Sequence, residues 1–498
     1  MSHPLPRRTL ASAGFRSTFA VGLLGLAACG SSAEAEIKPW NVLLITLDTT
    51  RADRLGCYGY NKARTPVIDD LADTGLRFER AISTAGITPM SHSSILTGLN
   101  NYKHGMRVFH SETVSHRLKD EVETLPEILQ DRGWRTGAAI SAYPVSEHYN
   151  LNQGFESFES GVVDVSNLSL ETQQSHSKFW SRGGATDSQR CGDQTIDDAI
   201  DFVGPAASEQ PWCLWVHLFD VHDYSVVPPA DFLDKLGVDC PAPNTFIQGQ
   251  AQHQWREQMY DPELAFIDQQ LGRLVKHLDD IGERDQTVIV ITADHGQGLL
   301  DGLKRHGWSK HRLLYDWSLR VPMIVNFPGS GASIVSDQVR TIDVLPTLLD
   351  TLGIPALANI EGRSMLPLVA GESEPSPRIA YADALNLHDS HSPSRRALKQ
   401  NYDNLYCATD GIWKLIWHQT NPQNSELFHL AEDPLELNNL YREDHPDAQR
   451  LFAFLKDRQA WKTEAPTTNQ RADASKLEGL GYTGDDEDAD ENETQEEE

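Results

Sequence analysis

Several apolar runs of strand length mark the chain, and three of them end at acidic or imidazole side chains. These three runs cover residues 41–47, 212–219 and 287–293. Apolar residues that are nearly continuous, rather than alternating with polar ones, are typical of strands buried on both faces of a parallel sheet. Ligands bind outside the carboxyl ends of such strands, so the residues that follow each run are candidates for a functional site.

Helical patterns alternate with the apolar runs. Apolar spacing predicts helices over 65–75, 121–131, 195–203, 262–281 and 341–352, with further strands at 137–141 and 321–327. Such alternation is typical of an α/β fold in which helices flank a mostly parallel sheet. The polar stretch 160–192 is expected to form an irregular excursion.

The pattern changes after about residue 370. Short strand candidates at 405–408, 412–417 and 426–430 precede a helical pattern over 446–461. We therefore expect a catalytic domain over 40–370 and a smaller α+β subdomain over 371–483. The acidic tail, 484–498, cannot bury enough apolar surface to fold and is expected to be disordered.

The stretch from Gly86 to Gly98 predicts a short helix with a hydroxyl at its start. Thr88 is expected at the N-cap, Pro89 at the first helical position and Gly98 at the end. The N–H groups and dipole at a helix N-terminus stabilise a bound anion. A hydroxyl there can either cap the helix or attack such an anion, and Thr88 alone does not distinguish the two roles.

The N-terminal segment resembles an export signal. Arg7, Arg8 and Arg16 precede the apolar run 19–28, which is too short to span a membrane, and Cys29 follows small residues. We expect a signal peptide over 1–28, lipidation of Cys29 as in a bacterial lipobox, and a tether over 29–39. The chain would then be an exported lipoprotein that faces the periplasm or the cell exterior. A plain secretory signal with an incidental cysteine is the alternative.

Composition narrows the possible partners. The formal net charge is −29, and it stays clearly acidic when the tail is discounted. Nucleic-acid binding requires a basic face, so no nucleic-acid partner is expected. Without Cys29, five cysteines remain, an odd number that leaves at least one thiol unpaired.

Acids and imidazoles follow the three apolar runs. Asp48 ends the first, Asp220 and His222 follow the second, and Asp294 and His295 end the third. A carboxylate and an imidazole at neighbouring positions on a glycine-assisted turn can bind one cation. His217, inside the second run, is interpreted as a packed strand residue.

These motifs, in this order, resemble the sulfatase family of the alkaline phosphatase superfamily. The resemblance rests on Asp48, on Thr88-x-x-Ser-His closing in Leu-Thr-Gly, on His104-Gly105 and on Asp294-His295-Gly296. Residues 425–440 and 477–482 resemble segments near the C-terminus of family members. The similarity extends over about 40–482 and implies a sulfatase-type sandwich with a C-terminal subdomain.

The chain departs from the sulfatase pattern at the key position. Sulfatases place cysteine or serine where Thr88 stands and convert it to formylglycine, whose hydrated aldehyde attacks sulfate. The β-carbon of threonine carries a methyl group, so no formylglycine is expected. Thr49 also replaces a second calcium-binding aspartate of many sulfatases. The set Asp48, Thr88, Asp294 and His295 resembles the single-metal site of superfamily phosphodiesterases and phosphoglycerol transferases.

The resemblance and the chemistry assign candidate roles. Asp48, Asp294, His295 and Thr88 would bind one divalent cation, with Zn²⁺ or Mn²⁺ favoured by the imidazole and Ca²⁺ still possible. Thr88 would be the metal-activated nucleophile. His311 stands where sulfatases have a substrate lysine, and a near-neutral pKa would let it protonate the leaving oxygen. The further candidates are catalytic His222 and His92 and substrate-binding Arg51, Arg107, Lys310 and His306.

Three hypotheses follow for a small or polymeric anionic ester substrate. The first is a metal-dependent phosphoesterase or phosphotransferase, the second is a sulfuric ester hydrolase without formylglycine, and the third is a non-catalytic binding protein. Specificity is expected to reside in 160–192 and 223–254. The sequence leaves the oligomeric state open.

Overall fold

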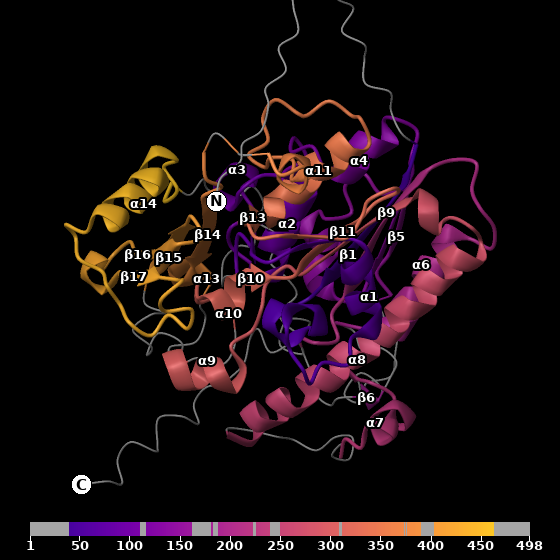
Figure 1. The fold of residues 1–498 in the computed structure, drawn as a ribbon, viewed down its shortest axis with the longest axis horizontal. Helices are drawn as coiled ribbons and strands as arrows, with labels where there is room; N and C mark the ends of the chain where they lie inside the picture. Colours follow the sequence, from indigo (N-terminus) through magenta and orange to yellow (C-terminus); the bar gives the residue numbers. More distant parts are fainter. Residues whose placement is uncertain are drawn as a thin grey trace, which may run out of the picture. The chain divides into compact units, whose positions relative to one another are not determined.

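An eight-stranded sheet contains the apolar runs (Figure 1). Its order is β12-β2-β11-β9-β1-β7-β4-β5. The central strands β9, β1, β7 and β4 are parallel, and β5 continues them, whereas β11 is antiparallel to both β9 and β2. The strands are β1 (Asn41–Leu47), β2 (Leu76–Phe78), β4 (Arg135–Ile140), β5 (Ser157–Glu159), β7 (Trp212–Leu218), β9 (Thr287–Thr292), β11 (Met323–Asn326) and β12 (Ser333–Val335). The expected α/β fold with a mostly parallel sheet is confirmed.

The computed structural model describes residues 39–109, 116–161, 181–182, 188–222, 226–239, 250–307, 311–372, 374, 376–389 and 403–462. The predictions for the signal peptide, for Cys29 and its tether, for the acidic tail and for most of 160–192 lie outside these residues. Within the described part, no helix is long and apolar enough to cross a membrane.

Helices cover both faces of the sheet. On one face, α1 (Pro66–Thr74), α6 (Gly192–Val203) and α8 (Gln250–Asp280) pack on Leu43 and Ile45. On the other face, α2 (Thr88–Thr97), α4 (Leu125–Gln130) and α11 (Val344–Thr351) pack on Val42 and Leu44. This alternation along β1 buries both faces of the strand, as its continuous apolar pattern predicts.

One helix and one strand differ most clearly from their predictions. The helix expected over 262–281 begins at Gln250, with Pro262 inside it. The strand expected over 321–327 is divided into β10 (Arg320–Val321) and β11. Pro322 lies at the division, where it has no N–H to donate to a neighbouring strand.

The C-terminal part forms a second, four-stranded antiparallel sheet in the order β14-β15-β16-β17. Its strands are β14 (Ala380–Leu385), β15 (Asn404–Thr409), β16 (Trp413–His418) and β17 (Glu426–His429), of which β14 was not predicted. One face packs against α14 (Pro446–Asp457) through Leu451 and Leu455. The other face packs against Leu314 and Trp317, so this sheet lies directly behind the segment that follows His311.

Candidate active site

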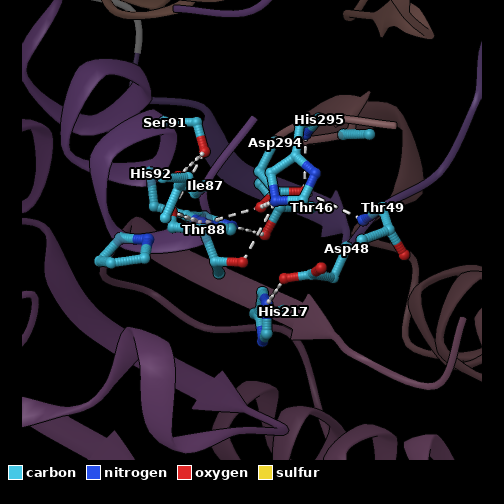
Figure 2. A network of polar contacts seen from close by, with 12 residues as sticks. Thr46, Asp48, Thr49, Ile87, Thr88, Ser91, His92, His217, Asp294 and His295 are labelled. Atoms are coloured by element: carbon cyan, nitrogen blue, oxygen red, sulfur yellow. Dashed lines mark hydrogen bonds and ion pairs between the residues drawn. The ribbon is translucent and has the colours of Figure 1, made fainter. Parts of the chain in front are cut away.

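The carboxyl ends of β1, β7 and β9 converge with the first turn of α2 (Figure 2). Asp48 follows β1, Asp294 and His295 follow β9, and His217 lies near the end of β7. Thr88 begins α2, and its side chain points towards this group. All five residues are fully buried. The convergence expected for Asp48, Thr88, Asp294 and His295 is therefore present.

Thr88 does not cap its helix. The N-cap residue is Ile87, which has an extended backbone, and Thr88 is the first helical residue. The N-cap prediction for Thr88 was wrong by one position. The Thr88 hydroxyl oxygen instead lies 3.3 Å from Nε2 of His295. Gly98 ends the helix as predicted, because it adopts the left-handed conformation with φ of 66°.

Asp48, Asp294 and His295 form a cluster that fits a divalent cation. One ligand atom from each residue lies within 4.8 Å of those from the other two. Asp48 Oδ1 and Asp294 Oδ2 are buried without a hydrogen-bond partner among the described residues. His295 Nδ1 lies 2.9 Å from the Gly296 carbonyl, so Nδ1 carries the hydrogen and Nε2 keeps its lone pair for a ligand. Two carboxylate oxygens and one imidazole nitrogen suit Zn²⁺ or Mn²⁺.

The electrostatics of the Asp48 and Asp294 carboxylates also favour binding of a cation. Burial raises the pKa of Asp48 to about 7, although His295 opposes this shift. Burial and the neighbouring Asp48 together raise the pKa of Asp294. Ionised carboxylates at such short range are costly in a dry site, and a divalent cation removes that cost.

A tight turn after β1 holds the Asp294 carboxylate in place. The backbone N–H of Thr49 donates to Asp294 Oδ1 at 3.1 Å, and the N–H of His295 donates to the same oxygen at 2.8 Å. Thr49 has φ of 50°, which is unusual for a β-branched residue. Tyr260 on α8 donates to the Thr49 carbonyl at 2.8 Å and stabilises this turn. Strain of this kind is concentrated at functional sites.

His92 positions the start of α2 rather than touching the reacting atoms. The Trp215 indole N–H can only donate, and it donates to Thr46 Oγ1, whose own hydrogen then goes to His92 Nε2. His92 Nδ1–H therefore donates to the Thr88 carbonyl at 2.8 Å. Burial lowers the pKa of His92 to about 3. Both ring nitrogens are used, which contradicts the prediction that His92 is catalytic.

His311 lies beside His295, and His222 lies beside His311. The His311 ring centre is 4.8 Å from that of His295 and 5.4 Å from that of His222. His311 Nδ1 bonds to the Gly86 carbonyl at 2.7 Å, which leaves Nε2 as its acceptor atom. Burial and the positive charges around it hold the pKa of His311 well below its usual range. The expected near-neutral pKa is therefore wrong for the metal-free, substrate-free protein.

Three predicted substrate-binding residues are engaged elsewhere. Arg51 forms ion pairs with Asp53 and Asp301. Arg107 forms an ion pair with Asp383, and its guanidinium also donates to two backbone carbonyls. These contacts contradict a substrate role for either arginine, because their donors face acids and carbonyls in the fold.

His306 is the third of these residues. Its Nε2 lies 3.1 Å from the Glu436 carbonyl, and its Nδ1 accepts a hydrogen bond from Trp317 at 3.0 Å. The ring also stacks on Tyr315. These contacts contradict the predicted substrate role of His306. Lys310 lies outside the described residues.

His217 was predicted as a packed strand residue, and it has a further contact. Its Nε2 lies 3.1 Å from Asp48 Oδ2. The signal in the sequence was the alternation along β7, where Cys213, Trp215 and Phe219 face the α2 side as apolar residues. An imidazole at the intervening position breaks an otherwise apolar face.

Comparisons with known proteins agree with this architecture. A family model described as Sulfatase matches residues 40–354, and one described as N-sulphoglucosamine sulphohydrolase, C-terminal, matches residues 304–463. An N-acetylglucosamine-6-O-sulfatase of Bacteroides thetaiotaomicron is 24% identical, covering 84% of this chain and 85% of that protein. Human N-sulphoglucosamine sulphohydrolase is 23% identical, covering 86% of this chain and 91% of that protein.

Two solved structures share the fold. The phosphonate monoester hydrolase of Agrobacterium radiobacter has a TM-score of 0.64 at 21% identity, covering 84% of this chain and 95% of that one. A protein solved in complex with its substrate D-glucosamine-2-N,6-O-disulfate also has a TM-score of 0.64 at 21% identity, covering 86% of this chain and 99% of that one. Because the Sulfatase model spans well over half of the residues, the chain belongs to the sulfatase family and is an ester hydrolase of that superfamily.

Proposed function

We propose that this chain hydrolyses a singly charged ester, of the phosphodiester or phosphonate monoester type, with the Thr88 hydroxyl as nucleophile. The observation that carries the proposal is the position of Thr88 Oγ1, 3.3 Å from His295 Nε2 in the first turn of α2. A threonine cannot become formylglycine, so its own hydroxyl is the nucleophilic group that this helix start supplies.

Asp48, Asp294 and His295 would hold the divalent cation that this chemistry requires. Bound there, the cation would lower the pKa of a neighbouring hydroxyl and neutralise a non-bridging oxygen of the ester. Asp48 Oδ1 and Asp294 Oδ2, which have no hydrogen-bond partner in the described part of the chain, support this assignment.

The residues of the chain then perform a two-step displacement. Thr88 Oγ1 bonds to phosphorus while the bond from phosphorus to the leaving oxygen breaks, and the hydroxyl proton passes from Oγ1 to a water molecule. His311 Nε2 is an acceptor in the free protein, so it takes up this proton from the water and delivers it to the leaving oxygen. Water then attacks phosphorus and leaves its hydroxyl there, the bond to Oγ1 breaks, and the other proton of the water restores the Thr88 hydroxyl.

The charges around the site favour a singly charged group. Burial keeps His92, His217 and His311 neutral, and a divalent cation would offset the two carboxylates. Arg312, next to His311, adds one positive charge near the ring. The two negative charges of a phosphate monoester would exceed the one positive charge that remains. The single negative charge of a diester, a phosphonate monoester or a sulfate ester would match it.

A sulfuric ester hydrolase is the second candidate. The family match and the sulfatase relatives favour it, and a sulfate monoester carries the same single negative charge. The reaction would proceed through a sulfated Thr88 in place of a phosphorylated one.

The experiment compares three p-nitrophenyl substrates on protein loaded with Zn²⁺ or Mn²⁺: bis(p-nitrophenyl) phosphate, p-nitrophenyl phosphate and p-nitrophenyl sulfate. We expect the diester to be hydrolysed fastest, Thr88→Ala to be inactive and Thr88→Ser to retain turnover. Mass spectrometry of quenched enzyme should find the phosphoryl group on Thr88. Fast turnover of the sulfate alone would select the second candidate. Equal turnover by wild type and Thr88→Ala would refute the assignment of Thr88 as the nucleophile.

We further propose that the chain is exported and anchored through Cys29, on the basis of the N-terminal sequence. Incorporation of radiolabelled palmitate into wild type, and none into Cys29→Ala, is the expected result. Release of the wild-type chain without label would contradict the anchor.

A further inference from the structure

The face of the sheet that supports α2 changes from apolar to polar just below the site. Val42 and Leu44 on β1 are followed on the same side by Thr46, and Cys213 and Trp215 on β7 are followed by His217. Thr46 and His217 are direct neighbours in the parallel register. A fully buried imidazole here requires partners for both ring nitrogens.

The hydrogen bonds of His217 have only one possible direction. The backbone N–H of Ser141 is a donor and lies 3.5 Å from His217 Nδ1, which makes Nδ1 the acceptor. Nε2 therefore carries the hydrogen and donates it to Asp48 Oδ2 at 3.1 Å (Figure 2).

The ring of His217 is held in place by its neighbours. It packs edge-on against His92, with ring centres 4.9 Å apart, and it also contacts Trp215 and Phe219. The side chain is completely buried. Its hydrogen bond engages Oδ2 of Asp48, whereas Oδ1 is buried with no hydrogen-bond partner among the described residues.

We infer that His217 is a positioning residue that sets the affinity of the site for its divalent cation. By donating to Oδ2, it directs Oδ1 of Asp48 towards the cation position and prevents rotation of the carboxylate. The inference rests on the cation site of the proposed function. Residues that orient a metal ligand in this way typically change metal affinity by about 10- to 100-fold when they are removed.

The test measures binding of the metal alone, on full-length protein stripped with chelator. Mn²⁺ is titrated and the free ion is followed by electron paramagnetic resonance, and Zn²⁺ is titrated by calorimetry. The variants are His217→Leu, which removes the donor, and His217→Gln, whose Nε2 can replace it. His217→Asn supplies a donor nearer Ser141, out of reach of Asp48. Ser141→Ala is the matched control, because it removes a hydroxyl that bonds to the His217 carbonyl and leaves the imidazole unchanged.

We expect His217→Leu and His217→Asn to weaken metal binding by about 10- to 100-fold, with His217→Gln and Ser141→Ala close to wild type. Thermal unfolding of the metal-free proteins shows that each variant is folded. If His217→Leu does not fold, the comparison of glutamine with asparagine decides the question.

Two results would overturn the inference while leaving the cation site intact: wild-type affinity in folded His217→Leu or His217→Asn, or the same loss in His217→Gln. Absence of Mn²⁺ and Zn²⁺ binding to the wild type would overturn the cation site as well.

Discussion

Replacing Asp48 by asparagine should stabilise the metal-free protein while removing its metal binding. Burial raises the pKa of Asp48 from 3.8 to about 7, so at high pH the native state holds a carboxylate in an unfavourable environment. Asparagine keeps an oxygen that can accept from His217 Nε2, and its amide can donate to Oδ2 of Asp294, which no described residue hydrogen-bonds. The substitution thus removes the charge and keeps the hydrogen bond.

The magnitude follows from linkage. Between about pH 4 and pH 7 the native Asp48 holds its proton whereas the unfolded chain has released it, so native-state stability falls as pH rises through this window. At about 1.4 kcal/mol for each pKa unit, wild type loses about 4 kcal/mol by pH 8 and about 2 kcal/mol by pH 5. Asp48→Asn avoids this loss.

The assay is urea unfolding of wild type and Asp48→Asn in the presence of chelator at pH 5 and pH 8. The stability advantage of the variant should grow from about 2 to about 4 kcal/mol between these two pH values. Added Zn²⁺ should stabilise wild type and leave the variant unchanged. A variant that is less stable than wild type at pH 8, or an advantage independent of pH, would refute the argument that this carboxylate is strained by burial.

Three further outcomes test other parts of the structure. Asp383→Asn should destabilise the protein by about 3 kcal/mol or more in urea unfolding, because it leaves the buried Arg107 charge without its counter-charge; an unchanged midpoint would contradict this. Gly296→Ala should lower both stability and Zn²⁺ affinity, because the new methyl group would lie 2.2 Å from the Trp317 carbonyl oxygen, and a normal metal titration would count against it. His311→Gln should slow hydrolysis of phenyl esters about 10²-fold more than that of p-nitrophenyl esters in paired kcat measurements, since a poor leaving group needs the proton. Equal losses for both esters would refute the role of His311 as proton donor.

The sequence alone determined the central strands and the residues that end them. The prediction for 41–47 matches β1 at both ends, and Asp48, Asp294 and His295 meet as expected. Continuous apolar runs indicate strands that are buried on both faces of the sheet. Parallel pairing places the carboxyl ends of these strands at one edge of the sheet. This part of the site is a local property of the chain combined with one rule of topology.

Tertiary structure alone decided the roles of the other polar residues. Arg51 pairs with Asp301 and Arg107 with Asp383, partners more than 200 residues away in each case. A basic side chain near a site motif looks the same in sequence whether it faces substrate or a distant carboxylate.

The sequence also did not determine the roles of the histidines, neither of those predicted for the site nor of the one predicted only to pack. His92 and His306 form hydrogen bonds with backbone carbonyls, whereas His217 contacts the carboxylate of Asp48 in the proposed metal site. The role of an imidazole depends on which donors and acceptors surround its two nitrogens. These neighbours come from separate strands and helices, so only the folded chain decides whether a buried histidine binds, positions or packs.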